Sequence, residues 1–406
     1  MQRQDEQGRT GPLAGVRVVD LSRALAGPHA AMMLGDLGAD VVKIESPDGG
    51  DDSRSYGPPF LEGTEGRESA YFLSCNRNKR SMALDLKSAE GKDVLSRLVR
   101  QADVLVENFR PGVLARLGFD VSVLHGLNPR LVILSISGFG HDGPEGGRPG
   151  YDQIAQGEAG LMSVTGPSPA EPQRVGVPIA DLTAGMYGAF GILAALLERE
   201  LTGRGQLVTT SLLAAVVGVH AFQGTNWTVA GQVAQPRGNH HPSIVPYGLF
   251  ACQDGGVQVA CGNEGIWQRL CAEFDLDPRA PGMESNLERV RNREAVTDLI
   301  SSVFADLDVT SLLARLASAG VPAGRVRTID DVYDWEQTRS QGLLIGVDHA
   351  SLGPIELPGP PLRFFADSRE VTPAAHTAPP LLDEHGDDVV AWLSRLEAAD
   401  TVRGPH

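Results

Sequence analysis

Val16-Arg-Val-Val-Asp-Leu21 is the first of a series of apolar runs from which the fold can be predicted. It is a short and mostly apolar run, which is typical of a buried strand. A helix is predicted from Pro28 to Leu37, because proline is favoured in the first turn of a helix, and Asp40-Val-Val-Lys-Ile44 is predicted to form the next strand. A strand, a helix and a second strand in this order make one βαβ unit, whose strands pair in parallel.

The same alternation continues along the chain. Further strands are predicted at Met82–Leu86, Asp103–Val106 and Leu131–Ile136, and a helix at Ala89–Arg100. This order indicates an α/β fold with a parallel, Rossmann-like sheet. The loop after the first strand, Ser22-Arg-Ala-Leu-Ala-Gly-Pro28, has one glycine where a dinucleotide site needs G-x-G-x-x-G, so the dehydrogenase fingerprint is missing.

The chain of 406 residues is too long for one ordinary core, so two domains are expected. Long apolar helices are predicted near Leu182–Leu197 and Leu207–Phe222, and the Gly/Pro-punctuated stretch Gly224–Pro246 follows them. We place the domain boundary there, with residues 1–225 before it and a smaller α+β domain after it. The smaller domain has predicted strands at residues 249–251 and 257–260, and predicted helices at 266–274, 289–307 and 311–318.

Composition excludes several classes of function. The sequence has 35 Lys and Arg against 51 Asp and Glu, a net charge of −16, which argues against nonspecific binding to nucleic acid or to an anionic membrane. Met1–Thr10 has no apolar core and no apolar run reaches the ~20 residues of a membrane span, so we expect a cytoplasmic protein without signal peptide or anchor. The four cysteines show no CxxC spacing, so we expect reduced thiols and no metal site.

A lone carboxylate, Asp181, stands at the mouth of the predicted helix Leu182–Leu197. At or near the N-cap, an Asp has a structural interpretation, because its oxygen accepts a hydrogen bond from a free backbone N–H. It also has a chemical one, since a carboxylate with an unperturbed pKa of about 4 is ionised at neutral pH and needs no base to act as a nucleophile. The position of Asp181 alone favours the structural interpretation.

Six further motifs cover nearly the whole chain: Ala26-Gly-Pro28, Leu37-Gly-Ala-Asp-Val-Val-Lys-Ile-Glu45, Asn76-Arg-Asn-Lys-Arg-Ser81, Val106-Glu-Asn-Phe-Arg-Pro-Gly112, Tyr151-Asp-Gln-Ile-Ala-Gln156 and Thr202-Gly-Arg-Gly-Gln206. In their order and spacing the sequence resembles the class III CoA-transferases, the formyl-CoA transferase and CaiB/BaiF-like group. The resemblance implies that residues 226–328 form the small domain and that residues 329–406 return to complete the large CoA-binding domain. It also implies an interlocked homodimer in which each chain threads a ring formed by the other.

In this family the residue at the position of Asp181 is the catalytic nucleophile, and the resemblance implies the same role here. Asp181 would attack an acyl-CoA to form an aspartyl–acyl anhydride, and the released CoA thiolate would return to form an aspartyl-CoA thioester. An acceptor carboxylate would then take over CoA through a second anhydride. Coenzyme A is a substrate in this scheme, and no permanently bound cofactor is implied. Because anhydrides hydrolyse, the pocket has to exclude water.

The resemblance places CoA-binding positions at Ala26, Lys79, Asn108, Phe109 and Arg116. Most of them also have a structural interpretation. The two cations are typical of solvated surface charges, the phenylalanine of a core residue and the asparagine of a turn former.

One cation of formyl-CoA transferase is missing from this chain, because Ser46 follows Lys-Ile-Glu where that enzyme has the charge. A negatively charged chain that binds an anion needs cations placed locally. Arg54 or Arg148 is expected to supply the missing charge.

Tyr151 falls on a substrate-pocket tyrosine of the family and separates two chemistries of the fold. The related α-methylacyl-CoA racemases have Gly-His-Asp where this chain has Gly150-Tyr151-Asp152, because abstracting an α-proton needs a base that exchanges protons near neutral pH. CoA transfer is therefore favoured, and an acyl-CoA racemase or epimerase is the alternative. His141 lies close to Tyr151 in the sequence and could be the base of a racemase, or it could be an exposed loop residue. Its position in the structure separates these two interpretations.

Arg237-Gly-Asn-His-His-Pro-Ser-Ile-Val-Pro-Tyr247 replaces the tetraglycine loop of formyl-CoA transferase, which disfavours formyl-CoA/oxalate exchange. It resembles a stretch of family members that act on succinyl-CoA and short dicarboxylates. Arg237, His240 and His241 are expected to bind a distal carboxylate through charge-assisted hydrogen bonds. A Pro-rich turn entering a strand is the structural alternative, and two adjacent histidines on an extended chain cannot both face one ligand.

The sequence therefore predicts a transferase that moves CoA from an acyl-CoA to a short carboxylic acid. Succinyl-CoA is the expected donor, and the acceptor is expected to be a dicarboxylic acid. Besides the racemase, a catalytically silent CoA-binding homologue is the remaining alternative.

Overall fold

The computed structural model describes residues 8–403, with side chains for residues 8–398. The stretch Met1–Thr10, predicted to be neither signal peptide nor anchor, lies mostly outside these residues. The chain forms two compact units. Unit 1 contains the described residues up to Leu161, then Val175–Thr225 and the chain from Glu336 onward, and unit 2 contains Met162–Arg174 and Asn226–Trp335.

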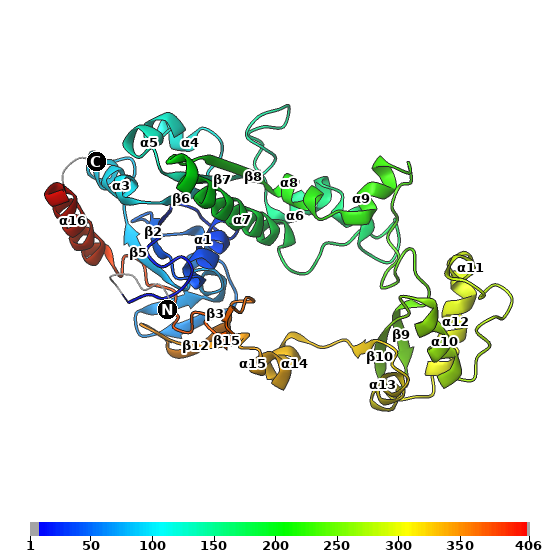
Figure 1. Ribbon diagram of the computed structural model, residues 1–406. Helices are drawn as coiled ribbons and strands as arrows, with labels where there is room; N and C mark the ends of the chain where they lie inside the picture. Colours follow the sequence, from blue (N-terminus) through cyan, green and yellow to red (C-terminus); the bar gives the residue numbers. More distant parts are fainter. Residues whose placement is uncertain (1–7, 404–406) are drawn as a thin grey trace. The chain divides into compact units, whose positions relative to one another are not determined.

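Unit 1 is built on one six-stranded sheet (Figure 1). Its strands are β1 (Arg17–Asp20), β2 (Asp40–Glu45), β5 (Lys79–Ala83), β6 (Val104–Glu107), β7 (Val132–Ser137) and β8 (Leu207–Ser211). They lie in the order β5-β2-β1-β6-β7-β8, and every neighbouring pair is parallel. This confirms the predicted α/β class and its parallel sheet, and the order reverses between β1 and β6 as in a doubly wound fold.

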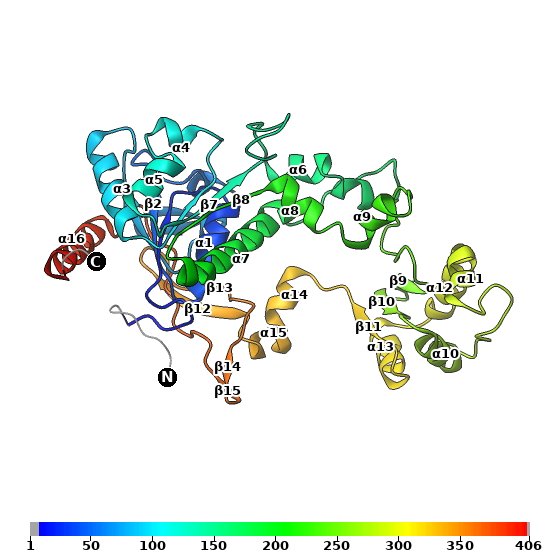
Figure 2. The same cartoon turned by 45° about the horizontal axis from the view of Figure 1, so that its top comes forward.

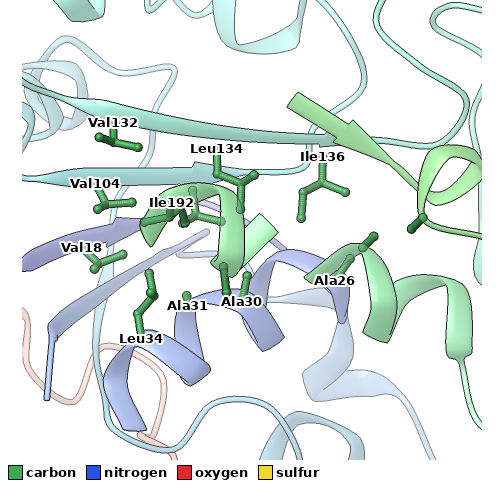
Figure 3. Packing of buried hydrophobic residues seen from close by; sticks show 14 of the residues in the cluster. Val18, Ala26, Ala30, Ala31, Leu34, Val104, Val132, Leu134, Ile136 and Ile192 are labelled. Carbon is green, nitrogen blue, oxygen red and sulfur yellow. The ribbon is translucent and has the colours of Figure 1, made fainter. Parts of the chain in front are cut away.

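Successive residues of a strand point to opposite faces, and both faces of this sheet are covered. Val18 and Val104 pack toward α1 (Ala26–Asp36), α7 (Ile179–Thr202) and α8 (Leu212–Gly218). Figure 3 shows this layer, with strand residues facing the small side chains of α1. The next residues, Val19 and Leu105, pack on the other face. There they meet α3 (Ala89–Gln101), α5 (Val121–Leu127) and α16 (Gly386–Arg403), as Figure 2 shows.

The helices α1 and α7 lie side by side, and Gly185 on α7 permits the contact. A Cβ at this position would stand 2.6 Å from the carbonyl oxygen of Ala26, closer than a side-chain carbon can approach. The backbone of α7 is therefore held directly against the first turn of α1. This contact brings the start of α7, with Asp181, next to the loop that follows β1.

The predicted helix Leu207–Phe222 is wrong. Its first five residues form β8, the edge strand beside β7, and two short helices, α8 and α9 (Ala221–Thr228), follow. The β-branched run Val208-Thr-Thr210 favours a strand, and β7 supplies the pairing partner. The other main helix, predicted at Leu182–Leu197, is longer at both ends and becomes α7.

The rest of unit 1 consists of short elements. They are η1 (Asp52–Ser55), the hairpin β3 (Phe60–Gly63) and β4 (Gly66–Ser69), α2 (Ala70–Leu73), α4 (Val113–Arg116), α6 (Asp152–Glu158), η2 (Leu161–Val164) at the unit's edge, α15 (Glu336–Ser340), and the hairpins β12 (Leu344–His349) with β13 (Gly353–Pro358) and β14 (Phe365–Ala366) with β15 (Arg369–Glu370).

Unit 2 has an antiparallel sheet of β9 (Tyr247–Cys252), β10 (Gly255–Ala260) and β11 (Ala323–Arg325). Its helices are α10 (Glu264–Glu273), α11 (Asn286–Arg291), α12 (Arg293–Phe304), α13 (Val309–Ser318) and α14 (Ile329–Asp334). The helix predicted at residues 289–307 is thus divided at Asn292. The apolar core of this unit lies between the sheet and α10, α12 and α13.

One helix among the described residues, α7, is long and apolar enough to cross a membrane by length and composition alone. Of its most apolar window, 44% is buried inside the chain, against α1, α8 and the sheet. The core helix of a protein outside a membrane passes the same test of length and composition.

Candidate active site

A cavity of about 350 Å³ lies where the loops after β1, β6 and β7 meet. In a doubly wound sheet this is the position where the strand order reverses, and loops there diverge to leave a crevice. It is lined by Arg23, Ala24, Leu25, Ala26, Asp52, Tyr56, Asn108, Phe109, Arg110, Pro111, Val113, Ile136, Ser137, Gly138, Arg148, Pro149, Gly150, Tyr151, Asp181 and Leu212.

Asp181 reaches this cavity from the first turn of α7, but it does not cap the helix. The N-cap is Pro178, so Asp181 is the third helical residue, and the predicted N-cap role is wrong. Asp152 supplies the cap from α6, because its Oδ1 accepts hydrogen bonds from the backbone N–H of Ala180 at 2.8 Å and of Asp181 at 3.3 Å. The Asp181 side chain is thereby left free to face the cavity.

The Asp181 carboxylate is half-buried, and among the described residues no group donates a hydrogen bond to it. Burial, and after it the negative charge of Asp152, raise the pKa of Asp181 to about 7. The expectation of an unperturbed pKa near 4 is therefore corrected. At neutral pH roughly half of the molecules carry the anion, and that anion is a stronger base than an ordinary aspartate.

Two tyrosines that the sequence did not single out stand close to this carboxylate. Tyr56 lines the cavity, and its ring meets that of Tyr71 edge to face at 5.2 Å. Burial, and then nearby groups that include Asp181, raise the pKa of both phenols. They are neutral hydrogen-bond donors at physiological pH. Tyr151, which was predicted, also lines the cavity and is 67% exposed.

Three of the five predicted CoA-binding residues line the cavity: Ala26, Asn108 and Phe109. Asn108 connects two of its walls, because its Oδ1 accepts from the backbone N–H of Arg23 and its Nδ2 donates to the Arg23 carbonyl, both at 2.8 Å. The Arg23 guanidinium lies 5.7 Å from the centre of the Phe109 ring. The loops after β1 and β6 are thus joined at the mouth of the cavity.

The structure does not bring Lys79 or Arg116 to this cavity. Lys79 is buried, and its ammonium donates to Asp20 at 2.9 Å, to the Pro28 carbonyl at 2.8 Å and to Asn76 at 2.8 Å. All three of its N–H donors are used, so none is left for a phosphate. Arg116 is exposed on α4 and does not line the cavity.

Neither arginine proposed to replace the missing cation at Ser46 is free. Arg54 forms a bidentate pair with Glu45, at 2.7 Å for each hydrogen bond, and stacks 3.7 Å from the Phe72 ring centre. Arg148 lines the cavity but pairs with Glu158 at 2.6 Å and Glu145 at 3.3 Å.

Two other arginines line the same cavity, Arg23 and Arg110, and neither forms an ion pair with a described residue. The unpaired positive charge of the site is therefore on Arg23 and Arg110.

His141 does not line the Asp181 cavity. Its Nε2 lies 2.7 Å from the Ser135 hydroxyl, which donates to Glu107, and these three residues line a second cavity of about 270 Å³. Burial lowers the pKa of His141. No histidine lines the Asp181 cavity in the part of the chain that the structure describes, so the histidine base of the racemases has no counterpart there.

In unit 2 the predicted acid-binding loop is held by an arginine that sequence reasoning missed. Arg293 donates to the backbone carbonyls of His241 at 2.8 Å and Pro242 at 2.7 Å. His240 packs edge to face on Phe250, whereas His241 lies against Tyr247 and its Nδ1 accepts from the Ser243 N–H. The two histidines therefore have different surroundings.

The charge of this loop also differs from expectation. Burial, and then Arg293, lower the pKa of His240 and His241, so both are neutral at pH 7. Arg237 is exposed and lies close enough to lower the pKa of Arg293 further, after burial has done so. The positive charge at this loop is consequently carried by Arg237 in the loop and Arg293 at the start of α12.

Comparison with known proteins shows consistent similarity. A sequence model of CoA-transferase family III matches residues 13–386. The chain is 38% identical to the succinate–glutarate CoA-transferase of Agrobacterium fabrum, over 98% of this chain and 99% of that protein. It is 37% identical to the succinyl-CoA:glutarate CoA-transferase of Mus musculus, over 95% and 87%. Among solved structures, a CAIB/BAIF family protein from Brucella suis is 39% identical, with a TM-score of 0.83 over 94% of this chain and 99% of that one.

Together, the doubly wound sheet, the cavity at its switch point and these similarities define an α/β enzyme that uses CoA thioesters. The chain belongs to CoA-transferase family III. The resemblance deduced from the six motifs is thereby confirmed.

The raised pKa of Asp181 has a measurable effect on stability. Between about pH 4 and 7 the folded chain keeps a proton on Asp181 that the unfolded chain releases, so the ionisation of Asp181 destabilises the fold progressively as pH rises through this range. Asp181→Asn removes this ionisation. The Tm of Asp181→Asn minus the Tm of the wild type, both measured by calorimetry, should increase as the pH rises from 5 to 8.

Asp308→Asn is the matched control, because Asp308 caps α13 and its pKa is lowered by hydrogen bonds, first from the Ser311 side chain. This variant should lose stability relative to the wild type at pH 8. A Tm difference for Asp181→Asn that stays constant with pH would contradict the raised pKa.

Proposed function

We propose that this enzyme moves CoA from succinyl-CoA to a second short carboxylic acid, for which a dicarboxylate such as glutarate is the first candidate. The observation that carries the proposal is the unligated Asp181 carboxylate in the cavity at the sheet's switch point. The acids named for the similar proteins from Agrobacterium fabrum and Mus musculus support the choice of substrates.

The reaction proceeds through four acyl transfers at Asp181. The carboxylate attacks the thioester carbonyl, the C–S bond breaks, and CoA leaves as thiolate while an aspartyl–succinyl anhydride forms. The thiolate then attacks the Asp181 carbonyl, which releases succinate and leaves an aspartyl-CoA thioester. The acceptor carboxylate attacks this thioester to give a second anhydride and thiolate. Finally, the thiolate attacks the acceptor's carbonyl, which releases the new acyl-CoA and regenerates Asp181.

The neutral phenols near Asp181 are suited to the oxyanions that form in these steps. Tyr56 and Tyr71 keep their protons because burial raises their pKa. A neutral O–H placed where charge develops stabilises a tetrahedral intermediate without a proton transfer. Tyr151, at the exposed edge of the cavity, is proposed to contact the substrate.

CoA is proposed to bind unit 1 along Ala26, Asn108 and Phe109, with its phosphates on Arg23 and Arg110. These two arginines take the place of the cation missing at Ser46, because Arg54 and Arg148 are already paired with carboxylates. Arg116 remains a proposed outer contact, and Lys79 is reassigned to the buried ion pair with Asp20. In this assignment residues 1–225 and 329–406 bind CoA, and residues 226–328 select the acid.

The acid is proposed to be selected by the loop of unit 2 that begins at Arg237. Arg237 and Arg293 provide the positive charge for a distal carboxylate, and the neutral His240 and His241 provide hydrogen bonds. Bidentate pairing with a carboxylate is the geometry that arginine favours.

We also propose a cytoplasmic, interlocked homodimer. Along α7 the apolar residues Met186, Phe190, Leu193, Leu197 and Leu201 recur at helical spacing and are exposed in the single chain, between 37% and 88%. An apolar stripe of this length on a monomer is typical of an interface, and a second copy of the chain would cover it.

Asp181→Asn should abolish transfer while the fold is kept. The substitution preserves the size of the side chain but removes the nucleophilic oxygen anion, so we expect kcat to fall roughly 10³-fold or more. The measurement is new acyl-CoA formed from succinyl-CoA and glutarate, followed by mass spectrometry. Hydroxylamine added during turnover should modify the peptide that contains Asp181.

Three outcomes separate the alternatives in the same assay. Labelling confined to another carboxylate reassigns the nucleophile. Exchange of the α-hydrogen in D2O without transfer indicates a racemase, and neither reaction indicates a silent CoA-binding protein.

Arg23→Ala should weaken binding of the acyl-CoA. Loss of one charge-assisted contact typically costs ~1.5–3 kcal/mol, which corresponds to a roughly 10- to 150-fold higher KM with a smaller change in kcat. Arg130→Ala is the control, since this arginine is exposed and pairs with Glu200 on the surface. Equal KM values for Arg23→Ala and Arg130→Ala would remove Arg23 from the phosphate site.

Arg237→Ala should be selective for dicarboxylate acceptors. We expect a roughly 10- to 150-fold loss in kcat/KM for glutarate and little change for a monocarboxylate such as butyrate, because only the former has a distal charge. Arg291→Ala is the control, as this arginine is exposed in the same unit and pairs with Glu288. An equal loss with both acceptors means that the loop acts structurally.

A further inference from the structure

Two carboxylates with different surroundings meet at the first turn of α7, Asp181 on the helix itself and Asp152 from α6. Asp152 uses both of its oxygens, since Oδ1 accepts from the N–H groups of Ala180 and Asp181 and Oδ2 accepts from Gln156 Nε2 at 2.7 Å. Gln156 is fully buried, and its Oε1 accepts from the Val175 N–H at 2.8 Å. A continuous chain of hydrogen bonds thus extends from Val175 to the first turn of α7.

This arrangement opposes what a helix N-terminus normally does to a carboxylate. Free N–H groups and the helix dipole favour the anion of an acidic side chain in the first turn. Here Asp152 takes the N–H groups of Ala180 and Asp181 and adds its own negative charge. Asp181 therefore gains little stabilisation from the helix on which it stands.

We infer that Asp152, held by Gln156, is a positioning residue for CoA transfer: it occupies the N-terminus of α7 and so keeps the Asp181 carboxylate unligated and strongly nucleophilic. This inference rests on the proposed function of Asp181. Its geometric basis is the hydrogen-bond chain through Gln156, which fixes Asp152 in the orientation that excludes Asp181 from the cap.

The influence of Asp152 on the Asp181 carboxylate has to be weighed against all other charges that face Asp181. The titratable and charged groups around it are Asp52 in η1, Tyr56 directly after η1, Tyr71 on α2, Tyr151 and Asp152 at α6, and Arg23, Arg110 and Arg148 at the cavity wall, with His29 on α1 against Gly185 one turn further along α7. Burial lowers the pKa of His29 to about 4, so it is neutral. Of these groups Asp152 is the one whose charge raises the pKa of Asp181, as a contribution second to burial.

Repulsion between the two carboxylates also favours the covalent intermediates. When Asp181 forms its bond to the acyl carbon and the thiolate leaves, the side chain loses its negative charge. Its interaction with Asp152 then changes from repulsive to neutral. The free enzyme is therefore destabilised relative to the anhydride and to the aspartyl-CoA thioester, which is how ground-state repulsion assists a nucleophilic step.

The test removes the charge of Asp152 while keeping its hydrogen bonds. In Asp152→Asn the side-chain oxygen can still accept from Ala180, but the new amide group meets the amide of Gln156, donor against donor. Adding Gln156→Glu replaces that donor with an acceptor and still provides an oxygen for the Val175 N–H. The double variant thus restores the hydrogen-bond chain and moves the negative charge away from Asp181.

The readout is the pH dependence of kcat/KM with succinyl-CoA and glutarate. We expect the acidic limb of the double variant to move about 1 pH unit or more to lower pH. The rate above pH 8 should fall by up to about 10-fold, because one pKa unit is a tenfold change in basicity. The fraction of aspartyl-CoA trapped by hydroxylamine should fall as well. Asp152→Asn alone should shift the limb in the same direction.

Asp308→Asn, which alters a helix cap in unit 2, controls for the loss of a capping charge and should leave the pH profile unchanged. A double variant with the wild-type limb and rate would overturn the inference and leave Asp152 as an ordinary helix cap. The same conclusion follows if neither Asp152 variant folds. Asp181→Asn separates a failure of the proposed function from a failure of this inference. Turnover in Asp181→Asn refutes the proposed function. If Asp181→Asn is inactive and the double variant has an unshifted acidic limb, only the inference about Asp152 is refuted.

Discussion

The N-terminus of α7 is satisfied by a carboxylate, and the surroundings of Asp181 depend on which carboxylate does so. Asp152 lies on a different helix, 28 residues earlier in the chain, yet it accepts the N–H groups of Ala180 and Asp181. Had Asp181 capped its own helix, its oxygens would be occupied and its pKa low. Because the cap comes from α6, Asp152 stabilises the start of α7, and Asp181 remains available for the proposed chemistry.

The position of this pair follows from the packing of the sheet. Gly185 lets α7 approach the backbone of α1, and α1 begins in the loop that leaves β1. The same loop is joined by Asn108 to the loop after β6, the strand on the other side of the switch point. The proposed nucleophile and the proposed CoA contacts are therefore positioned by packed helices and strands, as productive geometry requires.

The sequence was sufficient for the α/β class with its parallel sheet and for placing Asp181 at the start of a long helix, but not for the surroundings of either. Runs of valine predicted buried strands, because a parallel sheet is covered on both faces and its strands are apolar throughout. An apolar run alone does not separate a buried strand from a helix, so the start of Leu207–Phe222 was predicted to be helical, whereas it pairs with β7 as a strand. Lys79 is a cation in the family's CoA motif, and only the fold shows that Asp20 neutralises it inside the protein. Tyr56 and Tyr71 gave no signal, since their neighbour Asp181 is distant in the sequence.

The distribution of charge in the cavity gives CoA an orientation. The chain has a net charge of −16, and Arg54 and Arg148 near the site are paired with carboxylates. Arg23 and Arg110 are left unpaired at the cavity wall, whereas Asp152 and Asp181 concentrate negative charge at the start of α7. An anionic nucleotide is attracted to the arginines and repelled by the aspartates, but an uncharged thioester carbonyl is not repelled. In the proposed binding mode the uncharged parts of an acyl-CoA, the pantetheine arm and the thioester carbonyl, can therefore approach Asp181 without electrostatic cost, whereas the nucleotide phosphates are held at the arginines.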